Sequence, residues 1–169
     1  GPSVGIGTTT PSALFEVKNY ITFNPDDYTT RIGYNAGKNW EATSDGNTMV
    51  GQSAGGTGTW NAALNNTAVG YNAATFLSEG DNNTVIGNTA SGTLSTGSEN
   101  TVLGYAAGYS LSTDGRNTAI GSGSHYTPYA GGNEGVLASN TAVGYASMLF
   151  PNRGYKNVAL GAHSLAGSS

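Results

Sequence analysis

Cysteine, charge and long apolar runs are what this chain of 169 residues lacks. The absence of cysteine excludes disulfides and thiolate metal sites. Only 9% of the residues are charged, the net charge is −4, and the six Lys and Arg residues are scattered. We therefore expect no nucleic-acid partner, because phosphate binding needs a basic surface. No apolar run approaches the ~18 residues of a membrane span and no segment resembles a signal peptide, so we expect no membrane insertion.

Glycine is abundant, with 27 residues, and many of these glycines belong to a sequence motif that recurs along the chain. One copy, residues 66–73, reads Asn-Thr-Ala-Val-Gly-Tyr-Asn-Ala. Aligned on their glycines, the copies are 18, 19, 17, 17, 17, 23 and 17 residues apart, and such a period is the signature of a repeat fold. The glycine column comprises Gly33, Gly51, Gly70, Gly87, Gly104, Gly121, Gly144 and Gly161.

Four further columns keep a fixed place relative to the glycine. The aliphatic column, directly before it, is Ile32, Val50, Val69, Ile86, Leu103, Ile120, Val143 and Leu160. The threonine column, three residues before it, is Thr30, Thr48, Thr67, Thr84, Thr101, Thr118, Thr141 and then Val158. The asparagine column, four before it, is Asn47, Asn66, Asn83, Asn100, Asn117, Asn140 and Asn157. The small column, three after it, is Ala36, Ala54, Ala73, Ala90, Ala107, Ser124, Ser147 and Ser164.

These columns predict short β-strands, because β-branched residues favour strands and the aliphatic column never lapses, which argues against disorder. The threonine, aliphatic and small columns share the parity of one strand face, which we expect to be buried. A leucine column seven residues after the glycine, with Trp40, Leu77, Leu94 and Leu111, predicts a second short strand in each repeat. A glycine at one place in every copy indicates a backbone approach that a Cβ would obstruct.

Two strands and two turns in about 17 residues describe one coil of a β-solenoid, so we predict an all-β repeat fold. Residues 29–169 form eight coils, and stacking places each asparagine on the next in a ladder of amides. Residues 1–28 form an N-terminal lead-in, in which Gly1-Pro2 looks like the remnant of a cleaved tag, so we expect the natural chain to extend further. Asp26 and Asp27 suit either a cation site or, preferably, an Asx turn.

A coil of Val, Ile, Thr and Ala encloses little apolar volume, and a small core is marginal without extra burial. Because the chain also has little charge to cover its surface, these features favour association of several copies along a common axis, and closed symmetric homo-oligomers are the usual outcome.

Residues 29–164 resemble the head repeats of trimeric autotransporter adhesins. They resemble more closely the Asn-Thr-Ala-Ile-Gly arrays of phage tail fibres and of fibres in phage-derived injection systems. The opening, residues 4–17, is similar to segments that lead into the head or the terminal chaperone domain of tail fibres. The resemblance implies a left-handed parallel β-roll, assembled as an intertwined or side-by-side homotrimer with neighbouring fibre domains. It also implies an extracellular position, on a virion, a phage-like particle or a bacterial cell.

Irregularities in the repeat mark the candidate binding residues. The 23-residue interval contains an insert, residues 122–135, with His125, Tyr126 and Tyr129, and insertions in solenoids often form binding loops. We expect this loop to be exposed and to contact a receptor, or alternatively to staple neighbouring chains together. Trp60 lies in a glycine-rich turn and is either a cap or a contact residue.

The tyrosines that follow the glycines suit an exposed stripe or, preferably, packing between chains. They are Tyr34, Tyr71, Tyr105 and Tyr145.

Catalysis has little support, because neither histidine lies in a nucleophile motif and no acidic pair or phosphate loop is recognisable. We therefore predict no enzyme activity, no metal site and no cofactor. The predicted function is a trimeric fibre or adhesin domain that attaches a phage-like particle or a cell to a glycan or protein receptor. One alternative is a structural shaft with recognition elsewhere. Another is an ice-binding solenoid, against which the expected burial of the threonine face argues.

Overall fold

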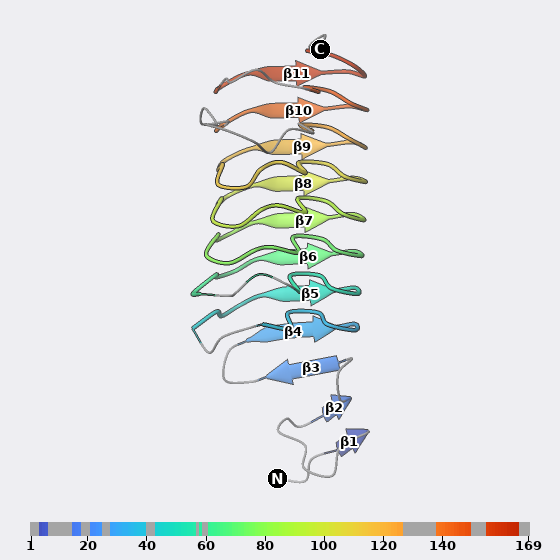
Figure 1. The fold of residues 1–169 in the computed structure, drawn as a ribbon, viewed down its shortest axis with the longest axis vertical. Coiled ribbons are helices and arrows are strands. Elements are labelled where there is room, and N and C mark those ends of the chain that lie inside the picture. The colour runs from blue at the N-terminus through green and yellow to red at the C-terminus, as the bar shows by residue number, and fades with distance from the viewer. Residues whose placement is uncertain are drawn as a thin grey trace.

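A computed structural model shows an all-β solenoid in which short strands are stacked along one axis (Figure 1). It describes residues 4–6, 15–17, 21–24, 28–39, 43–56, 58, 61–126, 138–149 and 155–165. The strands in these ranges are β1 (Val4–Ile6), β2 (Phe15–Val17), β3 (Ile21–Asn24), β4 (Thr29–Ile32), β5 (Thr48–Val50), β6 (Thr67–Val69), β7 (Thr84–Ile86), β8 (Thr101–Leu103), β9 (Thr118–Ile120), β10 (Thr141–Val143) and β11 (Val158–Leu160). Among the described residues, no helix has the length and apolarity to cross a membrane.

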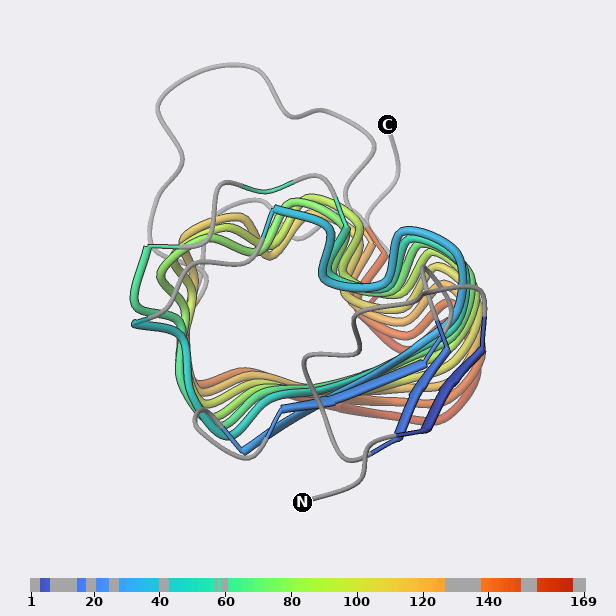
Figure 2. The same cartoon turned by 90° about the horizontal axis from the view of Figure 1, so that it is seen from below.

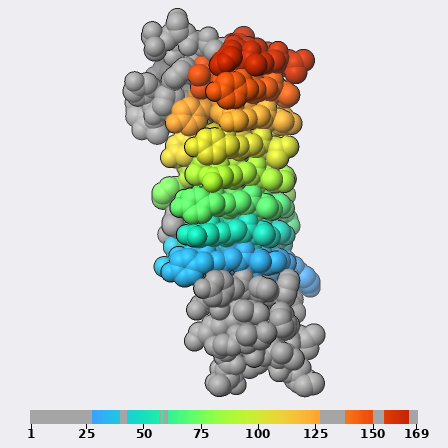
Figure 3. Space-filling view, turned by 90° about the vertical axis from the view of Figure 1, so that its right-hand side faces the viewer, coloured from blue at the N-terminus to red at the C-terminus, as the bar shows by residue number. Residues whose placement is uncertain are grey.

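All these strands belong to one sheet, in sequence order. From β4 to β11 every pairing is parallel and joins identical repeat positions, for example Thr84 with Thr101 and Ile86 with Leu103. The lead-in strands extend the same sheet, since β1 pairs parallel with β2 while β3 pairs antiparallel with both β2 and β4. The repeat therefore forms a rod whose layers are visible in the space-filling view (Figure 3).

Each coil has one strand side and one return side, as the view along the axis shows (Figure 2). The predicted second strand is wrong for the described coils, because the return side consists of turns and bends. Its backbone is kept from extending by left-handed residues two and four places after the glycine, such as Asn72 (φ 53°) and Ala74 (φ 47°). The coils are nevertheless hydrogen-bonded there, with the Ser78 N–H donating to the Ser95 carbonyl at 2.9 Å.

The threonine and aliphatic columns lie on the outer face of the sheet, which contradicts the predicted burial. Ile86 is 37% exposed and Leu103 is 46% exposed, whereas Val85 and Val102 between the two columns are buried. This inner column consists of Arg31, Met49, Ala68, Val85, Val102, Ala119, Ala142 and Ala159. Strand parity states which residues share a face, and closure of the coil determines which of the two faces is inside.

The core is narrow because small residues fill it. It combines the buried members of the inner and small columns with Leu77, Leu94 and Leu111, which are fully buried. Alanine contributes more of these buried positions than any other residue type. Trp40, the remaining member of the leucine column, lies outside the described residues.

The predicted asparagine ladder is confirmed, and Asn83 shows its geometry. The Asn83 Nδ2 group donates to Asn66 Oδ1 and to the Gly97 carbonyl, both at 2.9 Å. Asn83 Oδ1 in turn accepts bonds from the backbone N–H and the Nδ2 group of Asn100, both at 3.0 Å. The buried Asn83 amide thus ties its own coil to both neighbours.

The predicted role of the glycine column is also confirmed. Each repeat glycine up to Gly144 lies against the glycine of the next coil, and a Cβ on Gly104 would lie 2.7 Å from the Gly121 carbonyl oxygen. Gly104 also has a φ of 139°, which L-residues with side chains rarely adopt.

We expect Gly87→Val or Gly104→Val to destabilise the fold by a few kcal/mol, through collision with the next coil and backbone strain together. Thermal or denaturant unfolding would measure the loss. Gly161→Val is the matched control, because Gly161 has a φ of 112° but nothing within 4 Å of the added Cβ, so only strain remains. Equal losses at Gly104 and Gly161 would show that the close contact between coils contributes nothing.

We expect Asn83→Ala to cost about 2–4 kcal/mol, because it removes the bonds of the buried Gly97 carbonyl and Asn100 backbone N–H and one of the bonds to Asn66 Oδ1. Asn88→Ala, at an exposed position of the same coil, should have little effect on the same unfolding measurement. A loss no larger than that of the control would contradict a structural role for the ladder.

Candidate functional site

His125 is part of the core, and the prediction that it lies in an exposed loop is wrong. The side chain is 1% exposed, and its backbone N–H donates to the Ser147 carbonyl at 2.8 Å. The predicted loop 122–135 does not begin at residue 122, because residues 122–125 keep the regular backbone bonds of the coil. His125 therefore occupies a repeat position whose equivalent in the next coil is the buried Met148.

The imidazole of His125 is buried without hydrogen bonds that would offset the loss of its hydration. Neither ring nitrogen has a hydrogen-bond partner, and the nearby Ser124 hydroxyl is also buried without one. Burial lowers the pKa of His125 from 6.5 to about 4, against a smaller raising effect of the residue's own backbone. The ring is therefore neutral at pH 7.

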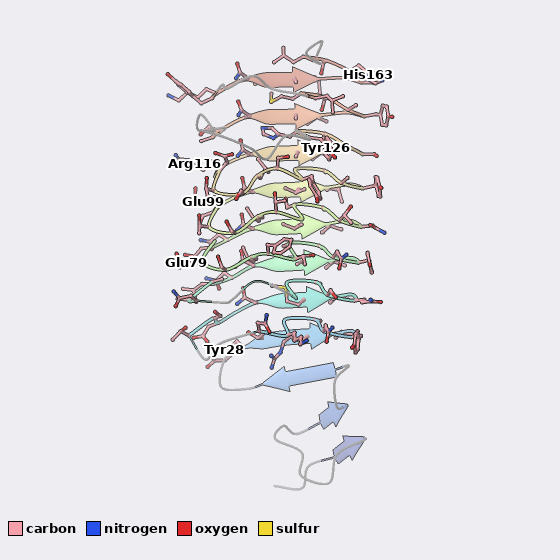
Figure 4. The ribbon with its side chains drawn as sticks, viewed as in Figure 1. Tyr28, Glu79, Glu99, Arg116, Tyr126 and His163 are labelled. Atoms are coloured by element: carbon pink, nitrogen blue, oxygen red, sulfur yellow. The ribbon has the colours of Figure 1, made fainter. Side chains whose placement is uncertain are left out.

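Tyr126 makes an aromatic contact with the preceding coil. Its ring lies 5.6 Å from that of Tyr109, which has the same repeat position one coil earlier, with 40° between the ring planes. Tyr126 is half-buried, and Figure 4 shows it in the upper part of the stack. The other two predicted contact residues, Tyr129 and Trp60, lie outside the described residues, so the exposure of the insert beyond Tyr126 stays a prediction.

The tyrosine column is exposed on the single chain, which is compatible with both interpretations of its sequence pattern, an exposed stripe and packing between chains. Its rings are between 45% and 62% exposed at Tyr34, Tyr71, Tyr105 and Tyr145. Coil-to-coil backbone bonds hold this corner, since the Thr89 N–H donates to the Tyr71 carbonyl at 2.8 Å and the Gly123 N–H to the Tyr105 carbonyl at 2.9 Å.

Charged side chains are placed elsewhere on the coil. Figure 4 shows Glu79, Glu99 and Arg116 along the edge that precedes the strands, while His163 lies at the opposite edge. In the part of the chain that the structure describes, no three His, Asp or Glu side chains group together in a way that would hold a metal ion. The candidate functional site therefore consists of two exposed surfaces. One is the outer face of the sheet, and the other is the tyrosine column at the corner beside it.

Comparison with protein-family models, curated proteins and solved structures finds no match to this chain. The outer sheet face is the feature that sequence reasoning missed. Its signal was present in the shared parity of the threonine and aliphatic columns, but parity alone does not distinguish an outer face from an inner one.

We expect the stability of the fold to fall between pH 6.5 and pH 4 because of His125. In this range the unfolded chain binds a proton that the folded chain, with its lowered pKa, does not bind, so acid favours unfolding by up to about 3 kcal/mol. Above pH 6.5 both states are neutral and the effect is absent. Unfolding curves at pH 7 and pH 4 measure it.

His125→Met should remove most of this pH dependence, because the next coil already accommodates Met148 at the same position. His163→Gln, at an exposed position, is the control and should leave the difference between pH 7 and pH 4 in place. An unchanged pH dependence in His125→Met would contradict the assignment.

Proposed function

We propose that this chain is a homotrimeric fibre domain that attaches a phage-like particle or a cell to a target surface by binding a receptor. The observation that carries the proposal is the uncovered outer face of the sheet, where β4 to β11 present threonine and aliphatic side chains in register. A flat apolar face of this length is typical of an interface, because exposed contiguous apolar patches on monomers are usually small or functional.

The narrow alanine-rich core supports the same proposal. A single solenoid buries few large side chains, and covering the outer sheet face with further copies would bury the aliphatic column of each one. Parallel arrangement around the rod axis gives a closed assembly without a free apolar face. The number three and the left-handed winding come from the resemblance to adhesin heads and tail fibres.

The rod shape supports attachment as the role of the proposed trimer. Three identical rods on one axis present each surface feature three times, so weak contacts with a repetitive cell surface are multiplied through effective concentration. The domain would act outside the cell, at the surface of a virion, a phage-like particle or a bacterium. A structural shaft with recognition in another domain is the alternative.

The outward threonine column also favours a second candidate, an ice-binding surface. Burial of this column would have excluded ice binding, but the column lies on the outer face of the sheet. Thermal hysteresis of the purified protein distinguishes the two, because a trimer that covers the face leaves no threonine plane for ice.

We expect light scattering after gel filtration to give about three times the 17.0 kDa chain mass. Ile86→Glu and Leu103→Glu should dissociate the assembly, since they place charge in the centre of the proposed interface. Phe76→Glu is the matched control, because Phe76 is exposed but lies outside the sheet, on the return side of its coil. A monomeric parent protein would contradict the trimer.

Binding of labelled protein to a panel of intact bacterial cells tests attachment. We expect binding to a subset of cells, weakened in the dissociated variants through lost multivalency. A trimer that binds none of the cells would support the shaft instead.

A further inference from the structure

The tyrosine column alternates strictly with other residues from coil to coil. Tyr34, Tyr71, Tyr105 and Tyr145 occupy every second coil, and Gln52, Asn88, Ser122 and Ala162 occupy the coils between them. These eight residues are called the tyrosine stripe below. Because stacked strands lie about 4.7–4.9 Å apart, successive rings recur about every 9.5 Å along the rod.

Coil spacing does not impose this alternation. Tyr109 and Tyr126 share another repeat position in adjacent coils, and their rings fit with centroids 5.6 Å apart. The neighbouring aliphatic column does not alternate, so the pattern is confined to the stripe. Leaving out every second ring keeps the tyrosines separate, whereas adjacent rings would cover each other's faces.

The stripe is also rigid and exposed. Backbone bonds repeat through it in consecutive coils, with the Ala106 N–H donating to the Asn88 carbonyl at 3.0 Å and the Ala146 N–H to the Ser122 carbonyl at 2.9 Å. The four rings are about half exposed. Their spacing is therefore set by the backbone ladder before any ligand arrives, which lowers the entropy lost on binding.

The chemistry of the stripe is aromatic, polar and uncharged. Neither of the two residues after any repeat glycine is Asp, Glu, Lys or Arg, and Glu79, Glu99 and Arg116 lie along the opposite edge (Figure 4). The His163 ring lies edge-on to the Tyr145 ring, with centroids 5.1 Å apart. Aromatic rings stack on the apolar C–H faces of sugar rings, while the amides of Gln52 and Asn88 both donate and accept hydrogen bonds, which suits hydroxyl groups. The ring spacing is close to the length of two linked pyranose units in an extended chain.

We propose that the tyrosine stripe binds an extended, neutral, β-linked polysaccharide, with a tyrosine beneath every second sugar. This inference rests on the proposed attachment function and names the chemical class of its receptor. A second copy of the chain fits the tyrosine stripe less well than a polysaccharide does. The rotational symmetry of the proposed trimer places the equivalent tyrosines of all copies at the same height along the rod. The tyrosines of one copy then cannot enter the gaps between those of another.

Titration calorimetry of the intact assembled protein with neutral β-1,4-linked glucose and N-acetylglucosamine oligomers tests the proposal. Binding should strengthen each time the oligomer gains two sugars, up to the length of the stripe, and charged polygalacturonate and helical α-linked amylose should bind poorly. Tyr71→Ala and Tyr105→Ala should each weaken binding about three- to tenfold, the loss of one aromatic contact. Tyr155→Ala, an exposed tyrosine outside the stripe, is the control.

An exchange variant tests the spacing without changing the composition. Tyr71→Asn combined with Asn88→Tyr keeps four tyrosines on exposed positions but makes their intervals unequal. We expect it to lose as much affinity as Tyr71→Ala, with circular dichroism and assembly mass unchanged. Parent-like affinity in the exchange variant would overturn the role of the two-coil spacing.

The remaining outcomes separate this inference from the proposed function. Cell binding without binding of either oligomer would overturn the polysaccharide site and leave attachment standing. Absence of both would overturn the two together. Loss of the assembled mass in Tyr71→Ala and Tyr105→Ala would assign the stripe to contacts between copies and overturn its role in ligand binding.

Discussion

The register of hydrogen bonds between successive coils is the constraint on which the rest of the structure depends. Parallel pairing joins each repeat position to the same position of the next coil. A residue in one coil therefore stacks on its equivalent, and a column that keeps one residue type in consecutive coils uses a side chain that can stack on itself. Alanine and leucine do so by apolar contact inside the coil, asparagine does so through its amide, and glycine is required where two backbones approach.

This constraint stabilises the stacking of coils along the rod and leaves the sides of the rod exposed. The asparagine ladder and the glycine contacts both run parallel to the axis, and neither buries the outer face of the sheet. A narrow coil with an alanine-rich interior has little apolar area to bury within itself. The uncovered sheet face and the tyrosine stripe are thus two neighbouring surfaces with different chemistry, one aliphatic and flat, the other aromatic with polar residues between the rings.

The same register makes an irregular residue conspicuous. His125 continues the coil backbone but places an imidazole where earlier coils have smaller residues such as Ala74 and Gly108. The ring finds no hydrogen-bond partner. Its burial follows from the backbone register, and a sequence interval of unusual length could not reveal it.

The amino-acid sequence by itself determined the period, the class of fold, the glycine contacts and the asparagine ladder. Each of these depends on a residue type stacking on itself, and such stacking is visible wherever a column repeats. Only the tertiary structure decided which face of the strand points inward, that the return side bends instead of forming a strand, and that His125 is buried. The physical reason is that alternation along a strand is symmetric between its two faces. Inside and outside are defined only when the chain turns through its left-handed corners and closes the coil.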